Sequence, residues 1–269
     1  MKIGIFDSGI GGLLMARSIR RAMPQYDLVY FGDTLHLPYG QRSTESIRRY
    51  TQQAMSFLFE NDCQLIIMAC NTATSAALRY LQQSYLPENY LERRILGVVV
   101  PTLEHCQLEG YTHIGLIGTR YIVESGIYDQ ELKKINPSSR LVSLQTPLLV
   151  PMIENNGMKW IEPVLQDYFA EMFGENHTAL DACILGCTHY IYLKDIIRGM
   201  LGEQVNVISQ DEIVPHRLID YLQRHPEIES KLSKNGQFSC YVTDKTMHFS
   251  QTAEMLYEEK LDIMTTEVA

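Results

Sequence analysis

Residues 182–190 read ACILGCTHY, and this stretch decides the fold that the sequence predicts. Its first five residues are small or apolar and indicate a buried strand, and a cysteine, a threonine and a histidine follow the strand directly. Residues 65–73, LIIMACNTA, have the same form. Cys70 and Cys187 therefore follow the ends of two equivalent strands.

Strands and helices alternate on both sides of these two stretches. The order strand, polar loop, helix, strand, loop, helix, strand, cysteine occurs twice, which is typical of parallel sheets covered by helices on both faces. We expect two pseudo-symmetric, doubly wound α/β domains with the active site in the cleft between them, where the carboxyl ends of the strands meet. The expected strands are 2–6, 28–31, 64–69, 95–100, 112–117, 140–144 and 181–185, and the expected helices are 13–23, 43–61, 73–85, 121–135 and 157–173.

Three further expectations concern the rest of the chain. Residues 32–42 and 147–156 are predicted loops, and Pro101 is expected to end the strand over 95–100 before the next helix. After Cys187 the pattern predicts helices over 193–201, 213–224 and 249–261 and strands over 204–208 and 238–242. Periodicity alone leaves open which domain this tail joins.

Composition excludes several classes of protein. The 269 residues carry a net charge of −9, which argues against a nucleic-acid-binding surface. No apolar run approaches the roughly 20 residues that span a bilayer, and the first strand meets Asp7 too early for a signal peptide. The six cysteines have no paired spacing, so we expect reduced thiols and a cytoplasmic protein.

Metal and nucleotide sites find no support in the motifs. The histidines do not have metal-ligand spacing, so we expect no metal. The glycines at 9, 11 and 12 do not complete a dinucleotide fingerprint, because Leu14 occupies its third glycine position. No lysine lies in a strand-end motif, which disfavours pyridoxal chemistry, and we expect no cofactor.

Cys70 and Cys187 are the candidate catalytic residues. A buried cysteine is most often inert, and Cys63, Cys106, Cys183 and Cys240 keep that interpretation. Cys70 and Cys187 differ because each opens a loop into a helix, where backbone amides and the helix dipole are expected to lower the thiol pKa.

Three neighbouring residues are candidates to assist these thiols. Asp7, at the end of the first strand, is expected beside the strand that leads to Cys70, although a helix N-cap is an equally good interpretation. His189 lies two residues after Cys187 and could poise its thiol, or it could be an ordinary loop histidine. Glu154 follows a strand and an apolar loop, and from the residues alone a surface carboxylate is the better interpretation of it.

Short polar side chains at the strand ends form a candidate binding set. Together with backbone amides of the glycine-rich and Tyr-Gly loops, they could hold a carboxylate without a cation, though each alone is an ordinary cap or turn residue. The side chains are those of Ser8, Asn71, Thr72, Thr119 and Thr188, and the amides include those of Tyr39 and Gly40.

Two thiols on opposite walls of a cleft suit the inversion of a carbon that carries an acidic proton. One base removes the proton from one face, and an acid delivers a proton to the other face. The ordinary cysteine pKa of about 8.5 lets thiol and thiolate coexist near neutral pH. Hydroxyls and amides could stabilise the charge that builds on the carboxylate.

In order and spacing, five motifs of this chain resemble those of bacterial glutamate racemases over nearly its whole length. They are DSGxGG at 7–12, PYG at 38–40, ACNTA at 69–73, GT at 118–119 and LGCTHY at 185–190. The resemblance implies cofactor-independent interconversion of L- and D-glutamate, which supplies D-glutamate for peptidoglycan. It also implies a first domain of residues 1–95 and 210–269, a second domain of residues 96–209, and a homodimer.

The resemblance further implies a role for each site residue. Cys70 would act on D-glutamate with the help of Asp7, and Cys187 would act on L-glutamate. His189 and Glu154 would support Cys187. The amino acid would be held by Ser8, Pro38, Tyr39, Gly40, Asn71, Thr72, Thr119 and Thr188.

This chain departs from the family pattern at three places. It has Ile122 where a threonine is usual, Ile191 where a proline is usual, and Ser209-Gln210 where Asp-Ser is usual. None of these removes a predicted catalytic group. Two alternatives stay open: a racemase of aspartate or another small carboxylate, and a non-catalytic protein that binds an amino acid.

Overall fold

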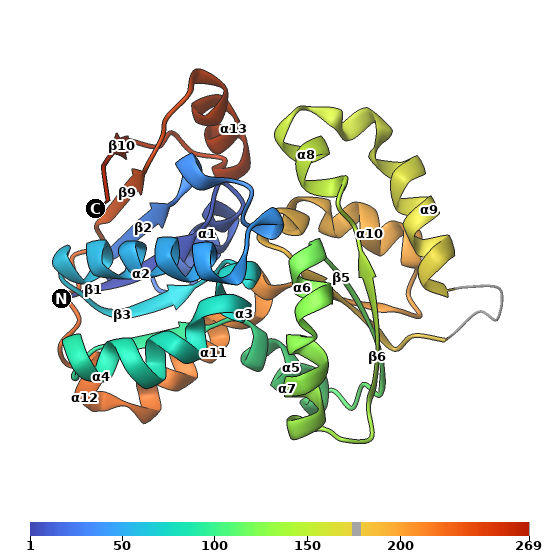
Figure 1. The fold of residues 1–269 in the computed structure, drawn as a ribbon, viewed down its shortest axis with the longest axis horizontal. Helices are drawn as coiled ribbons and strands as arrows, with labels where there is room; N and C mark the ends of the chain where they lie inside the picture. Colours follow the sequence, from blue (N-terminus) through green and yellow to red (C-terminus); the bar gives the residue numbers. More distant parts are fainter. Residues whose placement is uncertain (174–178, 269) are drawn as a thin grey trace.

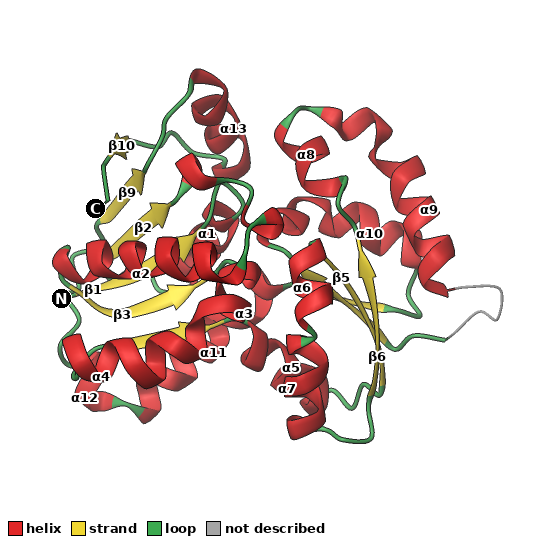
Figure 2. Ribbon diagram, viewed as in Figure 1, coloured by secondary structure: helices red, strands yellow, loops and turns green. Residues whose placement is uncertain are grey.

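The computed structural model describes residues 1–173 and 179–268 of the chain. It contains two separate sheets whose strand pairs are all parallel, and helices pack against both (Figures 1 and 2). The predicted fold class, two doubly wound parallel-sheet α/β domains, is therefore confirmed.

The first sheet has helices on both faces. Along β1, Ile3 and Ile5 join the hydrophobic cluster that contains α1, α11 and α13, whereas Phe6 joins the cluster that contains α2 and α3. This follows from the alternation of side chains along a strand. The sheet order is β10-β9-β2-β1-β3-β4. The elements are β1 (Lys2–Asp7), α1 (Gly12–Ala22), β2 (Leu28–Gly32), α2 (Thr44–Glu60), β3 (Cys63–Met68), α3 (Asn71–Tyr80), β4 (Arg94–Gly97), α11 (Gln210–Arg224), β9 (Phe238–Val242), α13 (Met247–Tyr257) and β10 (Ile263–Thr265).

The second sheet is built in the same way. Along β7, Cys183 and Leu185 pack with α8, α9 and α10, whereas Ala182 and Ile184 pack with α5 and α7. The sheet order is β6-β5-β7-β8. The elements are α5 (Val99–Leu108), β5 (His113–Gly118), α6 (Arg120–Ser125), α7 (Ile127–Ile135), β6 (Arg140–Gln145), α8 (Leu149–Glu154), α9 (Ile161–Phe173), β7 (Ala182–Gly186), α10 (Lys194–Leu201) and β8 (Asn206–Ile208).

The two sheets repeat one strand order. The series β2-β1-β3-β4 in the first sheet corresponds to β6-β5-β7-β8 in the second. The third strand along the chain in each series, β3 or β7, leads to a cysteine: Cys70 follows β3 after Ala69, and Cys187 directly follows β7. The internal symmetry inferred from the sequence is therefore a symmetry of strand order as well.

The last strands of the chain pair with the first sheet. Strand β9 pairs with β2, and β10, which the sequence did not predict, pairs with β9. Helix α13 was expected over 249–261 but runs from Met247 to Tyr257. In the first half of the chain, β4 extends to Gly97 and α5 begins at Val99, so the chain crosses between the sheets at Val98.

Two prolines lie inside helices where the sequence predicted a strand end and a loop. Pro101 lies in the first turn of α5, and Pro151 lies in the first turn of α8, within the predicted loop 147–156. The first N–H groups of a helix have no helical partner, so a proline costs little there. The predicted helix 121–135 is interrupted at Gly126, whose φ of 61° ends α6 before α7 begins.

Short elements complete the described part of the chain. The predicted loop 32–42 holds two of them, at Thr34–His36 and Tyr39–Gln41. The others are Leu81–Tyr85, Leu86–Asn89, Gly157–Trp160, Thr188–Leu193 and Pro226–Glu229. Across residues 1–173 and 179–268, no helix is both long and apolar enough to cross a membrane.

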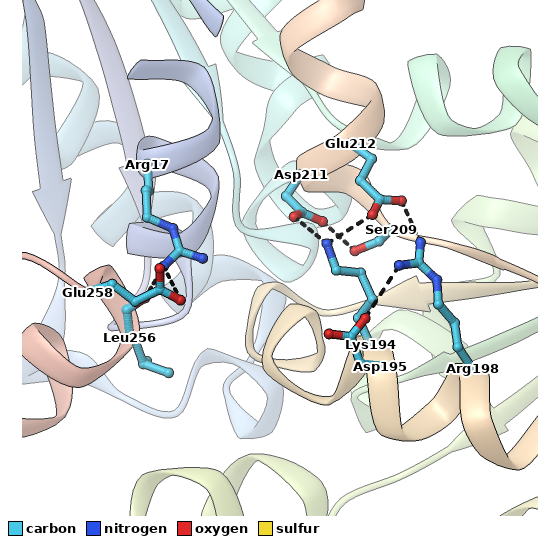
Figure 3. A network of polar contacts seen from close by, with 9 residues as sticks. All are labelled: Arg17, Lys194, Asp195, Arg198, Ser209, Asp211, Glu212, Leu256 and Glu258. Atoms are coloured by element: carbon cyan, nitrogen blue, oxygen red, sulfur yellow. Dashed lines mark hydrogen bonds and ion pairs between the residues drawn. The ribbon is translucent and has the colours of Figure 1, made fainter. Parts of the chain in front are cut away.

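Ion pairs join the second domain to the helix that returns to the first (Figure 3). Lys194 of α10 contacts Asp211 at 2.8 Å and Glu212 at 3.0 Å, and Arg198 contacts Glu212 at 2.7 Å. Both carboxylates lie in the first turn of α11, where the helix dipole favours negative charge. Because α11 also packs on α1, these contacts help to fix the two domains relative to each other.

Candidate active site

A cleft of about 670 Å³ lies where the carboxyl ends of the strands of both sheets meet. All the side chains predicted for the site line this cleft except Asp7, which is fully buried. The predicted residues that line it are Ser8, Pro38, Tyr39, Gly40, Cys70, Asn71, Thr72, Thr119, Glu154, Cys187, Thr188 and His189. The cleft thus has one cysteine from each domain in its wall.

Cys70 caps the N-terminus of α3. Its sulfur accepts a hydrogen bond from the backbone N–H of Ala73 at 3.4 Å and lies 3.3 Å from the hydroxyl of Ser8. Burial, and next the nearby charge of Asp7, raise the pKa of Cys70 to about 12 despite these two contacts. The lowered pKa predicted for this thiol is therefore wrong, because desolvation of the thiolate outweighs the helix amides. Burial therefore favours the thiol form of Cys70.

Asp7 lies beneath the cleft at the end of β1, next to β3. One carboxylate oxygen accepts the backbone N–H groups of Gly9 at 3.0 Å and Gly12 at 3.1 Å. The other accepts the hydroxyl of Thr188, in the opposite domain, at 3.1 Å. Burial raises the pKa of Asp7, although the nearby His189 and these hydrogen bonds act in the opposite direction.

His189 connects Cys187 to Glu154. Its Nδ1 lies 3.8 Å from the sulfur of Cys187, and its Nε2 lies 2.9 Å from a carboxylate oxygen of Glu154. Burial alone would lower the pKa of His189, but hydrogen bonding to Cys187 and Glu154 outweighs it and holds that pKa well above its ordinary value. An imidazolium at this position donates to both neighbours. The structure therefore gives the two thiols different surroundings.

Asp33 is a site residue that the sequence analysis missed. Asp33 directly follows β2, and its side chain is buried. The carboxylate accepts hydrogen bonds from the hydroxyls of Tyr39 at 2.6 Å and Thr243 at 2.9 Å. It thereby ties the Tyr39-Gly40 wall of the cleft to the residue that follows β9. The signal was available, because Asp33 directly follows a strand and Asp7 is the last residue of one.

A buried polar cluster behind the cleft was also missed. Asn71 exchanges two hydrogen bonds with Gln210, and its side-chain oxygen accepts a third from Tyr128. On the cleft wall, the hydroxyls of Thr72 and Thr119 lie 3.2 Å apart, one from each domain. No sequence pattern pairs these residues, because they come from helices far apart in the chain.

None of the departures from the family pattern is among the residues that line the cleft. Ile122 is buried in the core of the second domain, and Ile191 is buried against the core of the first. Ser209 donates its hydroxyl to Asp211 at the start of α11. Among the residues that the structure describes, no group of three or more His, Cys, Asp or Glu side chains could hold a metal ion.

Two facing α/β domains with one thiol each in the wall of a shared cleft form an arrangement that suits an acid–base isomerase. A model of the Asp/Glu/Hydantoin racemase family matches residues 13–213. The chain belongs to this family and is an amino-acid racemase.

Relatives of this chain include glutamate racemases. That of Geobacter metallireducens is 34% identical over 262 residues, covering 96% of this chain and 93% of the relative. That of Dinoroseobacter shibae is 35% identical over 278 residues, covering 99% of each. The crystal structure of Francisella tularensis glutamate racemase with D-glutamate has a TM-score of 0.86 at 29% identity, covering 99% of this chain and 97% of that one. An aspartate racemase of Picrophilus torridus shares the fold at a TM-score of 0.59 and 20% identity, covering 83% of this chain and 95% of that one.

Proposed function

We propose that this chain interconverts L- and D-glutamate without a cofactor, with Cys70 and Cys187 as its two bases. The observation that carries the proposal is the pair of thiols, one from each domain, in the wall of one small cleft lined by hydroxyls. The names of its relatives support glutamate as the substrate. None of the residues at which the chain departs from the family pattern lines the cleft.

In the L-to-D direction, the thiolate of Cys187 removes the α-proton of L-glutamate and becomes a thiol. The electron pair of the broken C–H bond passes toward the α-carboxylate, where hydrogen-bond donors stabilise the charge. The thiol of Cys70 then gives its proton to the opposite face of the carbon and becomes a thiolate. The enzyme that releases D-glutamate is therefore the form that starts the reverse reaction.

The surroundings of the thiols agree with these roles. The pKa of about 12 for Cys70 keeps it protonated, as a proton donor must be. An imidazolium at His189, held by Glu154, can donate to the sulfur of Cys187 while that sulfur is a thiolate. Asp7 would assist Cys70 through its charge, since it enters the environment of Cys70 as a negative group.

The hydroxyls and amides of the cleft wall would hold the amino acid. The residues proposed for this role are Ser8, Pro38, Tyr39, Gly40, Asn71, Thr72, Thr119 and Thr188. We further propose a cytoplasmic homodimer that supplies D-glutamate for peptidoglycan. We place the domain boundaries at Val98 and Ser209, close to the division expected from the sequence.

The test uses the variants Cys70→Ala and Cys187→Ala in deuterated buffer. Circular dichroism follows racemisation, and proton NMR follows exchange at the α-carbon. Each variant should lose racemisation by about 10³-fold or more, because general acid–base groups contribute factors of about 10²–10⁴. Cys106→Ala, at a buried cysteine of α5 outside the cleft, should stay near wild type.

Three results would contradict the proposal. Near-normal racemisation by either active-site variant would exclude the two-base mechanism. A higher kcat/KM for L-aspartate than for L-glutamate would change the substrate. Tight binding of glutamate by the wild-type chain with no exchange at the α-carbon would identify a non-catalytic binding protein.

A further inference from the structure

Four buried side chains form a polar cluster where the two domains meet behind the cleft. Asn71 opens α3 directly after Cys70, Gln210 opens α11, Thr102 lies in α5, and Tyr128 lies in α7. Each is at most 2% exposed. Figure 1 shows these helices converging at the junction of the two domains. The cluster therefore connects the Cys70 loop of the first domain to helices of the second.

The hydrogen bonds of this cluster fix the orientation of the Gln210 amide. The hydroxyl of Thr102 donates to the backbone carbonyl of Val98 at 2.7 Å, so toward Gln210 it can only accept. The Gln210 atom that faces Thr102 at 3.3 Å is therefore the nitrogen Nε2. That nitrogen also faces the oxygen of Asn71 at 2.9 Å and the hydroxyl of Tyr128 at 3.0 Å, so its two N–H groups are shared among three acceptors. The oxygen of Gln210 consequently accepts from the nitrogen of Asn71 at 2.7 Å.

The orientation of the Asn71 amide follows from that of Gln210. The Asn71 oxygen accepts from Gln210 and from the hydroxyl of Tyr128 at 2.7 Å, so both of its lone pairs are used. The Asn71 nitrogen has two N–H bonds, of which Gln210 uses one. Within the cluster, the amide therefore has one N–H and no acceptor left, and Asn71 is among the residues that line the cleft.

We propose that Gln210 is a positioning residue that fixes Asn71 as a hydrogen-bond donor to a substrate carboxylate. The inference rests on the proposed function, since it takes glutamate as the ligand. The amide-to-amide pair with Asn71 uses both the donor and the acceptor of the Gln210 side chain. With Gln210 removed, the Asn71 amide can turn and present its oxygen, which repels a carboxylate.

The variant Gln210→Leu tests this role with KM and kcat measured separately for both enantiomers. We expect KM for L- and D-glutamate to rise about 10-fold with kcat within about twofold, because one hydrogen bond to a charged group is worth about that factor. The control is Gln64→Leu. Gln64 is equally buried and donates to the backbone carbonyl of Glu92, but it does not line the cleft, so its loss should lower the melting temperature without changing KM.

A double-variant comparison shows whether Gln210 acts through Asn71. In an Asn71→Ala background, Gln210→Leu should leave KM unchanged. An equal rise in KM in both backgrounds would overturn the proposal. A Gln210→Leu variant with a lower melting temperature and an unchanged KM would overturn it as well. If Gln210→Leu does not fold, Tyr128→Phe removes one donor to Asn71 with little change in volume. It should raise KM about threefold, and an unchanged KM would overturn the proposal.

Failure of the proposed function can be distinguished from failure of the role of Gln210. If the wild-type chain did not racemise glutamate, the affinity for D-glutamate would be measured by calorimetry instead of KM. Gln210→Leu should then weaken binding about 10-fold, and an unchanged affinity would overturn the role of Gln210 by itself.

Discussion

The hydroxyl of Thr188 donates a hydrogen bond of 3.1 Å to the carboxylate of Asp7, across the boundary between the two domains. Thr188 is the neighbour of Cys187. Burial and, after it, the charge of Asp7 raise the pKa of Cys70. The contact therefore links the surroundings of the two thiols. It also lowers the pKa of Asp7, opposing the effect of burial.

Removal of this hydroxyl should impair catalysis. Thr188→Val keeps the shape of the side chain but leaves Asp7 with one donor fewer, so the pKa of Asp7 should rise further. We expect kcat/KM to fall about 10-fold, the usual cost of one hydrogen bond to a charged group. The fall must be equal for the two enantiomers, because their equilibrium constant is 1. Thr188→Ser, which keeps the hydroxyl, serves as the control, and equal activity of the two variants would contradict the prediction.

Asp7→Asn should make the protein more stable while lowering its activity. Burial raises the pKa of Asp7 in the folded state, so folding disfavours the ionised carboxylate. The resulting loss in the free energy of unfolding is absent below the unfolded pKa of about 4. It grows as the pH rises toward the folded pKa and is constant above the folded pKa. It amounts to about 1.4 kcal/mol for each tenfold change in proton affinity.

Chemical denaturation between pH 4 and pH 8 measures this effect. The stability gained by Asp7→Asn should increase across that range. Asp181→Asn is the control and should lose a nearly constant amount of stability from pH 4 to pH 8, because a lowered pKa changes stability with pH only below the unfolded pKa of about 4. Hydrogen bonds from His113 and Thr112 lower the pKa of Asp181, which lies far from the cleft lining. A pH-independent difference between wild type and Asp7→Asn would show that the carboxyl does not titrate as proposed.

Much of the fold could be predicted because the chain repeats one unit twice. The strands before Cys70 and Cys187 were located because buried parallel strands form continuous apolar runs. Strand β10 was missed because it has only three residues, Ile263–Thr265, and α8 was missed because Pro151 suggested a loop. Neither a helix with a proline in its first turn nor a three-residue edge strand is long enough to show a clear periodic spacing of apolar residues.

The pattern of strands located the site residues that lie at strand ends, whereas Pro38 and Glu154 were named from the family resemblance. Cys187 and His189 were located from the strand pattern, and Asp33 fits the same rule. Gln210 and Tyr128 lie on helices, and only the packing of α7 and α11 brings them to Asn71. The pKa of Cys70 could not be predicted either, because burial depends on the assembled cleft.

Gly12→Ala should damage both stability and activity. A β-carbon at Gly12 would lie 2.2 Å from the β-carbon of Asp7, so Asp7 would have to move. We expect a loss of about 1–3 kcal/mol in the free energy of unfolding and a lower kcat. Gly199→Ala is the matched control. Gly199 lies in α10, and a β-carbon added there would have no atom within 4 Å, so this variant should be about 1 kcal/mol more stable than the wild type. Normal kcat for Gly12→Ala would contradict the proposed role of Asp7.

Glu154→Gln should impair the step at Cys187 selectively. Glu154 accepts from His189, and its charge helps to hold the pKa of His189 high. Without that charge, His189 should be neutral over more of the working pH range and should support Cys187 less well. Because L- and D-glutamate have equal free energies, kcat/KM must fall by the same factor in both directions. The difference between the two proton-transfer steps therefore has to be measured with isotopes.

The measurement compares L- and D-glutamate that carry deuterium at the α-carbon. If Cys187 removes the proton of the L-enantiomer, slowing its step makes that removal rate-limiting, and the isotope effect on kcat/KM for L-glutamate should increase. For D-glutamate, removal of the deuteron by Cys70 becomes a rapid pre-equilibrium, and its isotope effect should decrease. Glu124→Gln, at an exposed carboxylate of the same cleft, should change neither. If Glu154→Gln decreased the isotope effect for L-glutamate and increased that for D-glutamate, the assignment of the two cysteines to the two enantiomers would be reversed. If both isotope effects changed equally, Glu154 would not act on the step at Cys187.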